Sequence, residues 1–175
     1  LIGLFAFAIM LFPMMVNAES MTGDVPTYDE ANNILVANGT PIVIEEENGN
    51  TYVTWEGGNK QLVNSETSIV GGYHNPCDIN SADGSCDIDL SSVSITMNGG
   101  SVRSIIAGNQ ITADYAKYSK IHVDNIQVTV NGGILNGIFG LTDGRTALGS
   151  SYYEIINEYY TADNVKIDIN NAVVR

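Results

Sequence analysis

Oxygen-bearing side chains gather around the two cysteines of the chain, Cys77 and Cys86. Alternating carboxylates and amides, a glycine and a carboxylate at the twelfth position are typical of calcium-binding loops. Four residues follow this pattern: Asp78, Asn80, Asp83 and Asp89. One extra residue between Asn80 and Asp83 displaces the third ligand, so the spacing permits only a loosely built Ca²⁺ site. A polar turn closed by a disulfide is the alternative interpretation.

Paired carboxylates are the second candidate for chemistry. Asp87 and Asp89 would lie about 7 Å apart on one face of a strand, where one carboxyl can act as an acid and the other as a base. The corresponding faces later in the chain carry serine, threonine and glutamine instead. We therefore interpret this pair as part of a solvated strand.

No arrangement for nucleophilic catalysis is visible. Neither His74 nor His122 has a serine or cysteine at a recognisable motif spacing. Arg103 and Lys120 could act as lyase-type bases, but no repeated or paired residue supports that role. The sequence does not decide whether the protein is an enzyme, and the lack of a catalytic motif favours a protein without enzymatic activity.

Tyrosines give the best indication of binding. Their flat amphipathic rings stack against sugar faces, and their hydroxyls form hydrogen bonds. Six tyrosines fall in two stretches between expected strands: Tyr115, Tyr118, Tyr152, Tyr153, Tyr159 and Tyr160. The alternative is that Tyr152 and Tyr159 belong to the buried stripe of a short helix.

The overall charge excludes two classes of partner. The 175 residues include 7 Lys and Arg against 20 Asp and Glu, for a formal net charge of -13. Nucleic-acid phosphates and anionic lipid surfaces attract basic patches, which such a chain lacks. We expect an extracellular glycan or protein as the partner, and no cofactor except Ca²⁺.

The first residues are typical of a secretory signal peptide. Residues 1–16 are uncharged and apolar, and Val16-Asn17-Ala18 offers small residues at a cleavage site. We predict cleavage after Ala18 in a bacterial secreted or cell-surface protein, with an uncleaved anchor as the alternative. Export makes a Cys77–Cys86 disulfide the expected state, and two free thiols the alternative. The missing basic n-region and the strand pattern near Arg175 lead us to expect a longer protein.

The next region predicts a helix followed by a hairpin. Thr27 and Glu30 form a capping box, apolar residues follow at helical spacing, and Asn38-Gly39 supplies a left-handed stop. These signals predict a short helix over residues 28–37. Asn48-Gly49 between two β-rich runs, residues 42–44 and 51–55, predicts a β-hairpin.

A strand–turn–strand unit then repeats along the chain. The segments VTWEGG at 53–58, ITMNGG at 95–100 and VTVNGG at 128–133 align without gaps, and IDINNA at 167–172 fits with both glycines replaced. A second strand recurs around Ile69, Ile105 and Ile138. Unequal spacing of such copies is typical of stacked repeats whose insertions lie in outer loops.

Each unit alternates apolar and polar residues, which indicates strands with one buried and one solvated face. Asn98, Asn131 and Asn170 fall at the same corner of successive units. Stacked in register, their amides would hydrogen-bond along the stack as a ladder. The glycines that follow allow the backbone to turn where a Cβ would clash.

This h-x-h-N-G-G-x-h-x-x-h-h-x-G repeat resembles the right-handed parallel β-helices of bacterial secreted and surface proteins, especially adhesin-like ones. The resemblance implies an all-β solenoid, with the short helix plugging its N-terminal end. An antiparallel β-sandwich, in which each Asn-Gly-Gly closes a hairpin, is the alternative fold. Hairpins require no alignment between copies, whereas a stack does, so the solenoid is favoured.

The expected organisation follows from these features. A signal peptide occupies residues 1–18, a leader with the capping helix and first hairpin strand occupies 19–50, and solenoid repeats fill 51–175. The expected function is an adhesin-like binding or structural module that acts on glycans or proteins. The alternative is the N-terminal part of a secreted polysaccharide lyase or glycoside hydrolase.

Overall fold

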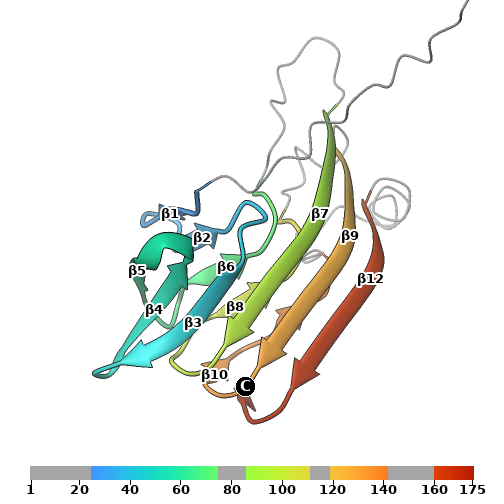
Figure 1. Cartoon of the computed structure of the whole chain (residues 1–175). Helices are drawn as coiled ribbons and strands as arrows, with labels where there is room; N and C mark the ends of the chain where they lie inside the picture. Colours follow the sequence, from blue (N-terminus) through green and yellow to red (C-terminus); the bar gives the residue numbers. More distant parts are fainter. Residues whose placement is uncertain (1–24, 75–85, 111–118, 142–159) are drawn as a thin grey trace, which may run out of the picture.

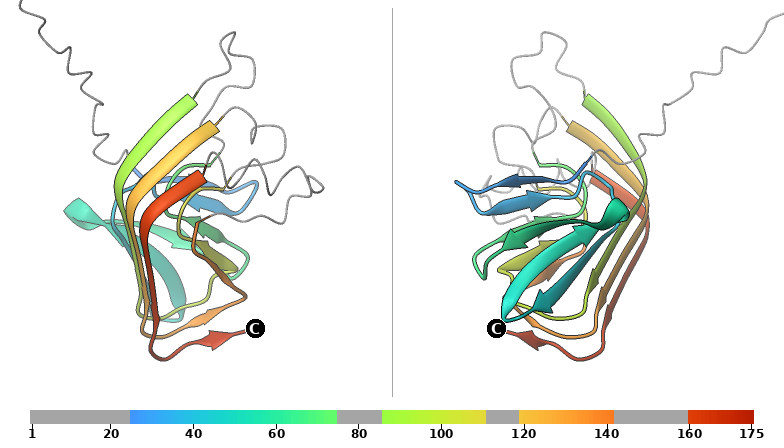
Figure 2. Two further views of the ribbon diagram at one scale, coloured as in Figure 1. Left: turned by 90° about the vertical axis from the view of Figure 1, so that its right-hand side faces the viewer. Right: turned by 60° about the vertical axis from the view of Figure 1, so that its left-hand side comes forward.

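The computed structural model describes residues 25–74, 86–110, 119–141 and 160–175, which form an all-β protein (Figure 1). No α-helix occurs within these ranges, and the one helical turn is the 3-10 segment η1, Glu56–Gly58. The strands form a six-stranded sheet, a five-stranded sheet and a two-stranded sheet. The two larger sheets face each other across the hydrophobic core (Figure 2).

The six-stranded sheet is mixed, with the order β12-β9-β7-β3-β4-β5. Its strands are β3 (Ile42–Glu47), β4 (Asn50–Trp55), β5 (Asn59–Val63), β7 (Cys86–Met97), β9 (Ser119–Val130) and β12 (Tyr160–Ile169). The strands β12, β9, β7 and β3 are parallel, whereas β4 and β5 are antiparallel to their neighbours. Asn48 and Gly49 adopt positive φ between β3 and β4, so the predicted hairpin is confirmed.

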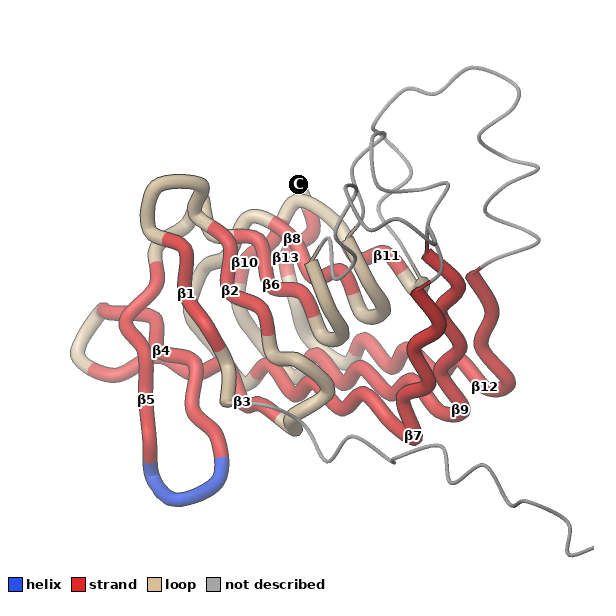
Figure 3. The backbone as a smooth tube through the Cα atoms, turned by 90° about the horizontal axis from the view of Figure 1, so that it is seen from above, coloured by secondary structure: helices blue, strands red, loops and turns tan. Residues whose placement is uncertain are grey.

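The five-stranded sheet has the order β1-β2-β6-β8-β11 (Figure 3). Its strands are β1 (Thr27–Asp29), β2 (Ile34–Val36), β6 (Ser68–Val70), β8 (Ser104–Ile106) and β11 (Ile138–Phe139). Ile69, Ile105 and Ile138, the recurring second strand of the sequence, are register partners in parallel pairs. The strands β10 (Ile134–Leu135) and β13 (Val173–Val174) form the small parallel sheet.

The core follows from the alternation within the long strands. Ile126, Val128 and Val130 of β9 point inward and are buried, whereas the residues between them face solvent. Farther up the strand Val123 is buried too, and two consecutive exposed residues, Asp124 and Asn125, separate it from Ile126. Pairing with β7 skips Asp124, so the long strands bend at this position (Figure 2).

The predicted helix over residues 28–37 is wrong. Its two halves are the antiparallel strands β1 and β2, joined by a turn in which Asp29 accepts hydrogen bonds from the amide and side chain of Asn32. Ile34, Leu35 and Val36 are consecutive apolar residues that gain a parallel partner in β6, which a helix would forgo. Short apolar runs fit a strand as well as a helix, and tertiary pairing decides between them.

The predicted first copy of the repeat, residues 53–58, is also wrong. Residues 42–44 of β3 occupy that place, because they pair in parallel with residues 95–97 of β7. The amide of Asn98 donates to the carbonyl of Ile44, just as the amide of Asn131 donates to the carbonyl of Met97. Parallel pairing also includes residues 34–36 of β2, which pair with residues 68–70 of β6.

Candidate functional site

The outward face of β7, β9 and β12 is a continuous polar surface. Parallel pairing without slippage places Ser94, Gln127 and Lys166 in one row, and Thr96, Thr129 and Asp168 in another. The outward positions of the three strands carry only polar or charged residues, listed by strand: Asp89, Ser91, Ser92, Ser94, Thr96; His122, Asp124, Asn125, Gln127, Thr129; Thr161, Asp163, Asn164, Lys166, Asp168. We call this surface the polar face.

Asparagine hydrogen bonds join neighbouring strands at two places, one at the end of the polar face and one within it. Asn131 donates from its side-chain amide to the Asn98 oxygen at 2.9 Å, and Asn170 donates to the Asn131 oxygen at 2.8 Å. The three asparagines expected at a common corner are thus joined side by side. At the bend, Asn164 donates to Asn125 at 3.1 Å in the same manner.

The glycine pairs that follow Asn98 and Asn131 have a steric cause. Gly133 adopts a φ of +108°, and a Cβ there would collide with the Met97 methyl and come within 2.8 Å of the Gly100 carbonyl oxygen. Gly100, at the equivalent place, has a φ of +84°. Side chains with a Cβ rarely adopt such conformations.

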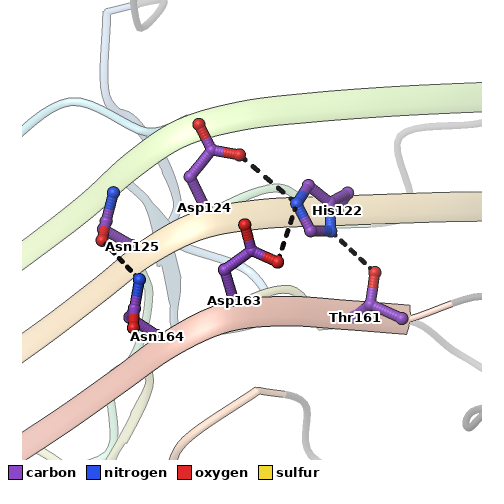
Figure 4. Close-up of polar contacts among 6 residues, drawn as sticks. All are labelled: His122, Asp124, Asn125, Thr161, Asp163 and Asn164. Atoms are coloured by element: carbon purple, nitrogen blue, oxygen red, sulfur yellow. Dashed lines mark hydrogen bonds and ion pairs between the residues drawn. The ribbon is translucent and has the colours of Figure 1, made fainter.

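A cluster of ligating groups lies at the bend, at one end of the polar face (Figure 4). Nε2 of His122 lies 3.3 Å from an Asp124 carboxylate oxygen and 3.6 Å from an Asp163 carboxylate oxygen. Nδ1 of the same ring lies 2.8 Å from the Thr161 hydroxyl. The parallel register of β9 and β12 creates this arrangement, because Thr161 pairs with His122 across the two strands. We call His122, Asp124 and Asp163 the His/Asp/Asp cluster.

The cluster is open to solvent. The side chain of His122 is 34% exposed, and those of Asp124 and Asp163 are 53% and 65% exposed. Asp89 of β7 is the register partner of His122 and is also exposed. Two carboxylates from adjacent strands therefore face one imidazole at a surface that water and ions reach.

Most residues singled out from the sequence lie outside the described structure. Asp89 alone of the four predicted Ca²⁺ ligands is described; the loop that carries Asp78, Asn80 and Asp83 is not. The side chains of the two cysteines and of the six tyrosines also lie outside the described structure. Of these residues, only the backbones of Cys86 and Tyr160 are described, at the first residues of β7 and β12. The calcium site, the disulfide and the tyrosine surface stay predictions.

Sequence reasoning missed the His/Asp/Asp cluster. Sequence motifs relate His122 only to a serine or cysteine partner, and no motif includes Asp124 or Asp163. The signal that could have found it is the alignment of Asp124-Asn125 with Asp163-Asn164 in successive repeats. Once those copies stack in register, His122 and Asp124 lie on the same strand face and Asp163 joins them from the next strand.

Two other charged groups have structural explanations. Burial lowers the pKa of His74, and the nearby Asp29 carboxylate opposes that shift. At the tip of the β3–β4 hairpin, a hydrogen bond to Glu47 raises the pKa of Lys60, whose ammonium also lies 4.5 Å from the Tyr52 ring centre.

A comparison with protein-family models, curated proteins and solved structures found no match to the chain. In the described ranges, no helix has the length and apolarity needed to cross a lipid bilayer.

Proposed function

We propose that the chain is an exported right-handed parallel β-helix whose polar face binds a glycan at the cell surface or outside the cell. The observation that carries this proposal is the in-register parallel pairing of β7, β9 and β12. It aligns chemically similar side chains in rows that run across successive strands. Such rows offer a long, repetitive binding surface.

The order of the strands supports the β-helix. The strands β6, β8 and β11 of one sheet are each followed in the chain by β7, β9 and β12 of the other. The chain passes from one sheet to the other and back, so each strand lies beside an earlier strand of its own sheet and parallel to it. In one sheet β8 pairs with β6 and β11 pairs with β8; in the other β9 pairs with β7 and β12 pairs with β9. Crossover connections between parallel strands are right-handed in about 98% of cases. The antiparallel sandwich is the competing arrangement.

The composition of the polar face favours a glycan over a protein partner. Its hydroxyl, amide and carboxylate groups are those that hydrogen-bond to sugar hydroxyls. Protein interfaces depend instead on buried aromatic and arginine anchors, and no such residue occurs among the outward positions whose side chains are described. The six tyrosines predicted to bind would supply stacking surfaces for sugar rings.

Export is part of the same proposal. The uncharged apolar segment of residues 1–18 and the small residues before position 19 support it. An extracellular location brings the polar face into contact with cell-wall, capsule or host polysaccharides. The acidic chain would then favour neutral or cationic sugars over polyanionic ones.

A binding assay with matched variants tests the proposal. Soluble polysaccharides of neutral, cationic and anionic type are titrated into the protein and into Gln127→Ala and Gln61→Ala. Gln127 lies in the middle of the polar face, whereas Gln61 lies on β5, outside it. Loss of one hydrogen bond of about 1 kcal/mol predicts about fivefold weaker binding for Gln127→Ala and no change for Gln61→Ala.

Three outcomes would contradict the proposal. Equal effects of the two substitutions would show that the polar face does not bind the glycan. Binding of no polysaccharide, together with capture of a defined protein ligand, would favour a protein partner. Shortened polysaccharide chains after incubation would favour the lyase or hydrolase alternative.

A further inference from the structure

We propose that the His/Asp/Asp cluster binds a divalent transition-metal cation of the zinc type between β9 and β12. None of its ligands belongs to the Ca²⁺ set expected from the sequence, and the proposal does not depend on glycan binding. Its ligands are Nε2 of His122 and one carboxylate oxygen each from Asp124 and Asp163.

The distances between the ligand atoms match such a site. Zinc in tetrahedral geometry, with ligands at about 2.0–2.2 Å, places ligand atoms about 3.3–3.5 Å apart. The observed separations from Nε2 are 3.3 Å and 3.6 Å, and all three ligand atoms lie within 4.8 Å of one another. Rotation of one exposed carboxylate closes the remaining gap.

The orientation of the imidazole is the second observation. Metal-bound histidines almost always hydrogen-bond through their other ring nitrogen, which fixes the ring and its tautomer. The Thr161 hydroxyl takes that place at 2.8 Å from Nδ1. Both ring nitrogens of His122 therefore face oxygen atoms, and the tautomer with the proton on Nδ1 donates to Thr161 and leaves the lone pair of Nε2 facing the two carboxylates. In that tautomer a bound cation would accept electron pairs from all three groups.

The charges of the cluster give a third reason. Parallel register brings Asp124 and Asp163 to the same place on adjacent strands. Like charges in that position destabilise a sheet. A divalent cation neutralises both carboxylates and links the two strands, so its binding stabilises the attachment of β12 to β9.

The donor set selects the class of metal. Ca²⁺ takes six to eight oxygen ligands, and Mg²⁺ keeps several waters and prefers carboxylates and phosphates. An imidazole with carboxylates suits zinc and its neighbours in the first transition row. The exposed side chains leave the remaining coordination position to water.

Calorimetric titration of the chelator-treated protein with Zn²⁺ alone tests the site. We expect one Zn²⁺ per chain, at least tenfold weaker binding in His122→Ala and Asp163→Asn, and no response to Ca²⁺ at the same concentration. Asp168→Asn is the matched control, because it removes a solvent-accessible carboxylate, paired with Lys166 at 2.9 Å, from the same strand outside the cluster. Its affinity for Zn²⁺ should equal that of the unchanged protein.

Two further variants separate metal ligation from other effects. Thr161→Val preserves the side-chain shape and removes the contact with Nδ1, so we expect about tenfold weaker binding. In Cys77→Ser/Cys86→Ser, Zn²⁺ affinity should be unchanged, because no thiol belongs to the site. Nitrogen-15 chemical shifts of the His122 ring in the unchanged protein should report direct Zn²⁺ coordination at Nε2.

Several results would overturn the proposal. Equal losses in Asp163→Asn and Asp168→Asn would mean diffuse attraction of cations to an acidic surface. Loss of binding in the double serine variant would place the metal at the cysteines. An unchanged Nε2 shift during a saturating Zn²⁺ titration would exclude His122 as a ligand.

Discussion

Neighbouring strands of the same repeat bury their apolar side chains to very different extents. On β9, Ile126, Val128 and Val130 are 2%, 0% and 0% exposed. Their register partners on β12 are 49%, 38% and 51% exposed: Val165, Ile167 and Ile169. The alternation of apolar residues is the same, so the pattern determines which face points inward. Burial depends on whether a strand lies between two neighbours, as β9 does between β7 and β12.

At the opposite edge of the same sheet, a hairpin covers the last parallel strand. There the β4–β5 hairpin covers β3, whose Ile42 and Ile44 are 2% and 0% exposed. Lys60 on β5 forms an ion pair with Glu47 at 2.7 Å. Charged residues on an edge strand discourage pairing with other chains. One edge of the described sheet is therefore antiparallel and charged, whereas the β12 edge presents an apolar inner face.

The largest expected effect tests the burial contrast directly. Ile126→Ala should lower the free energy of unfolding by about 3 kcal/mol, because a fully buried isoleucine leaves a cavity. Ile167→Ala on β12 should cost about 1 kcal/mol, because its side chain already contacts solvent. Urea unfolding of both variants gives the two values. Equal losses would contradict the difference in burial between the two strands and show that β12 is covered in solution.

The turn glycines give the next largest effect. Gly133→Ala should destabilise by about 2–3 kcal/mol, because the new Cβ is strained at positive φ and also collides with neighbouring atoms. Gly58→Ala shares the positive φ but meets no atom within 4 Å, so a cost of about 1 kcal/mol is expected. Thermal unfolding compares the pair. A larger loss for Gly58→Ala would contradict the close stacking at the corner.

The asparagine ladder allows a central strand and an edge strand to be compared through their hydrogen bonds. Asn131 makes two ladder hydrogen bonds, whereas Asn170 makes one. Asn131→Leu should therefore cost about 1 kcal/mol, the lower end for stranded amides because the site is exposed. Asn170→Leu should cost about half as much. Equal values in urea unfolding would mean that the ladder does not contribute bond by bond.

The smallest effect concerns the metal and the β12 edge. If Zn²⁺ links β12 to β9, its addition should slow amide hydrogen exchange in β12 by several-fold more than in β7. His122→Ala should abolish that difference without changing exchange in β7. Uniform slowing across all three strands would indicate general stabilisation and not a local link.

Several features could be predicted from the sequence because they depend on local chemistry. Asn48-Gly49 accepts positive φ at both positions and so predicts a hairpin without any tertiary contact. The aligned asparagines and glycines predicted a common corner, where the three amides are joined by hydrogen bonds. Alternation in β7 and β9 predicted their inward faces.

Other features required knowledge of the neighbours. Residues 34–36 carry helix and strand signals alike, and only the partner strand β6 decides between them. Residues 53–58 match the repeat letters, yet β3 takes the stacked position and β4 folds back against it. The His/Asp/Asp cluster joins residues separated by 39 positions, so its existence depends on register and not on a local motif.

The polar face requires the in-register parallel pairing of β7 with β9. Disulfide cross-linking in a Cys77→Ser/Cys86→Ser background tests it, with cysteines introduced as Thr96→Cys/Thr129→Cys or as Ser94→Cys/Thr129→Cys. The first pair is in register, at a Cα separation of about 5 Å that a disulfide can bridge, whereas the second is offset to about 8 Å. The account predicts efficient cross-linking of the first pair only. Cross-linking of the offset pair, or of neither pair, would contradict it.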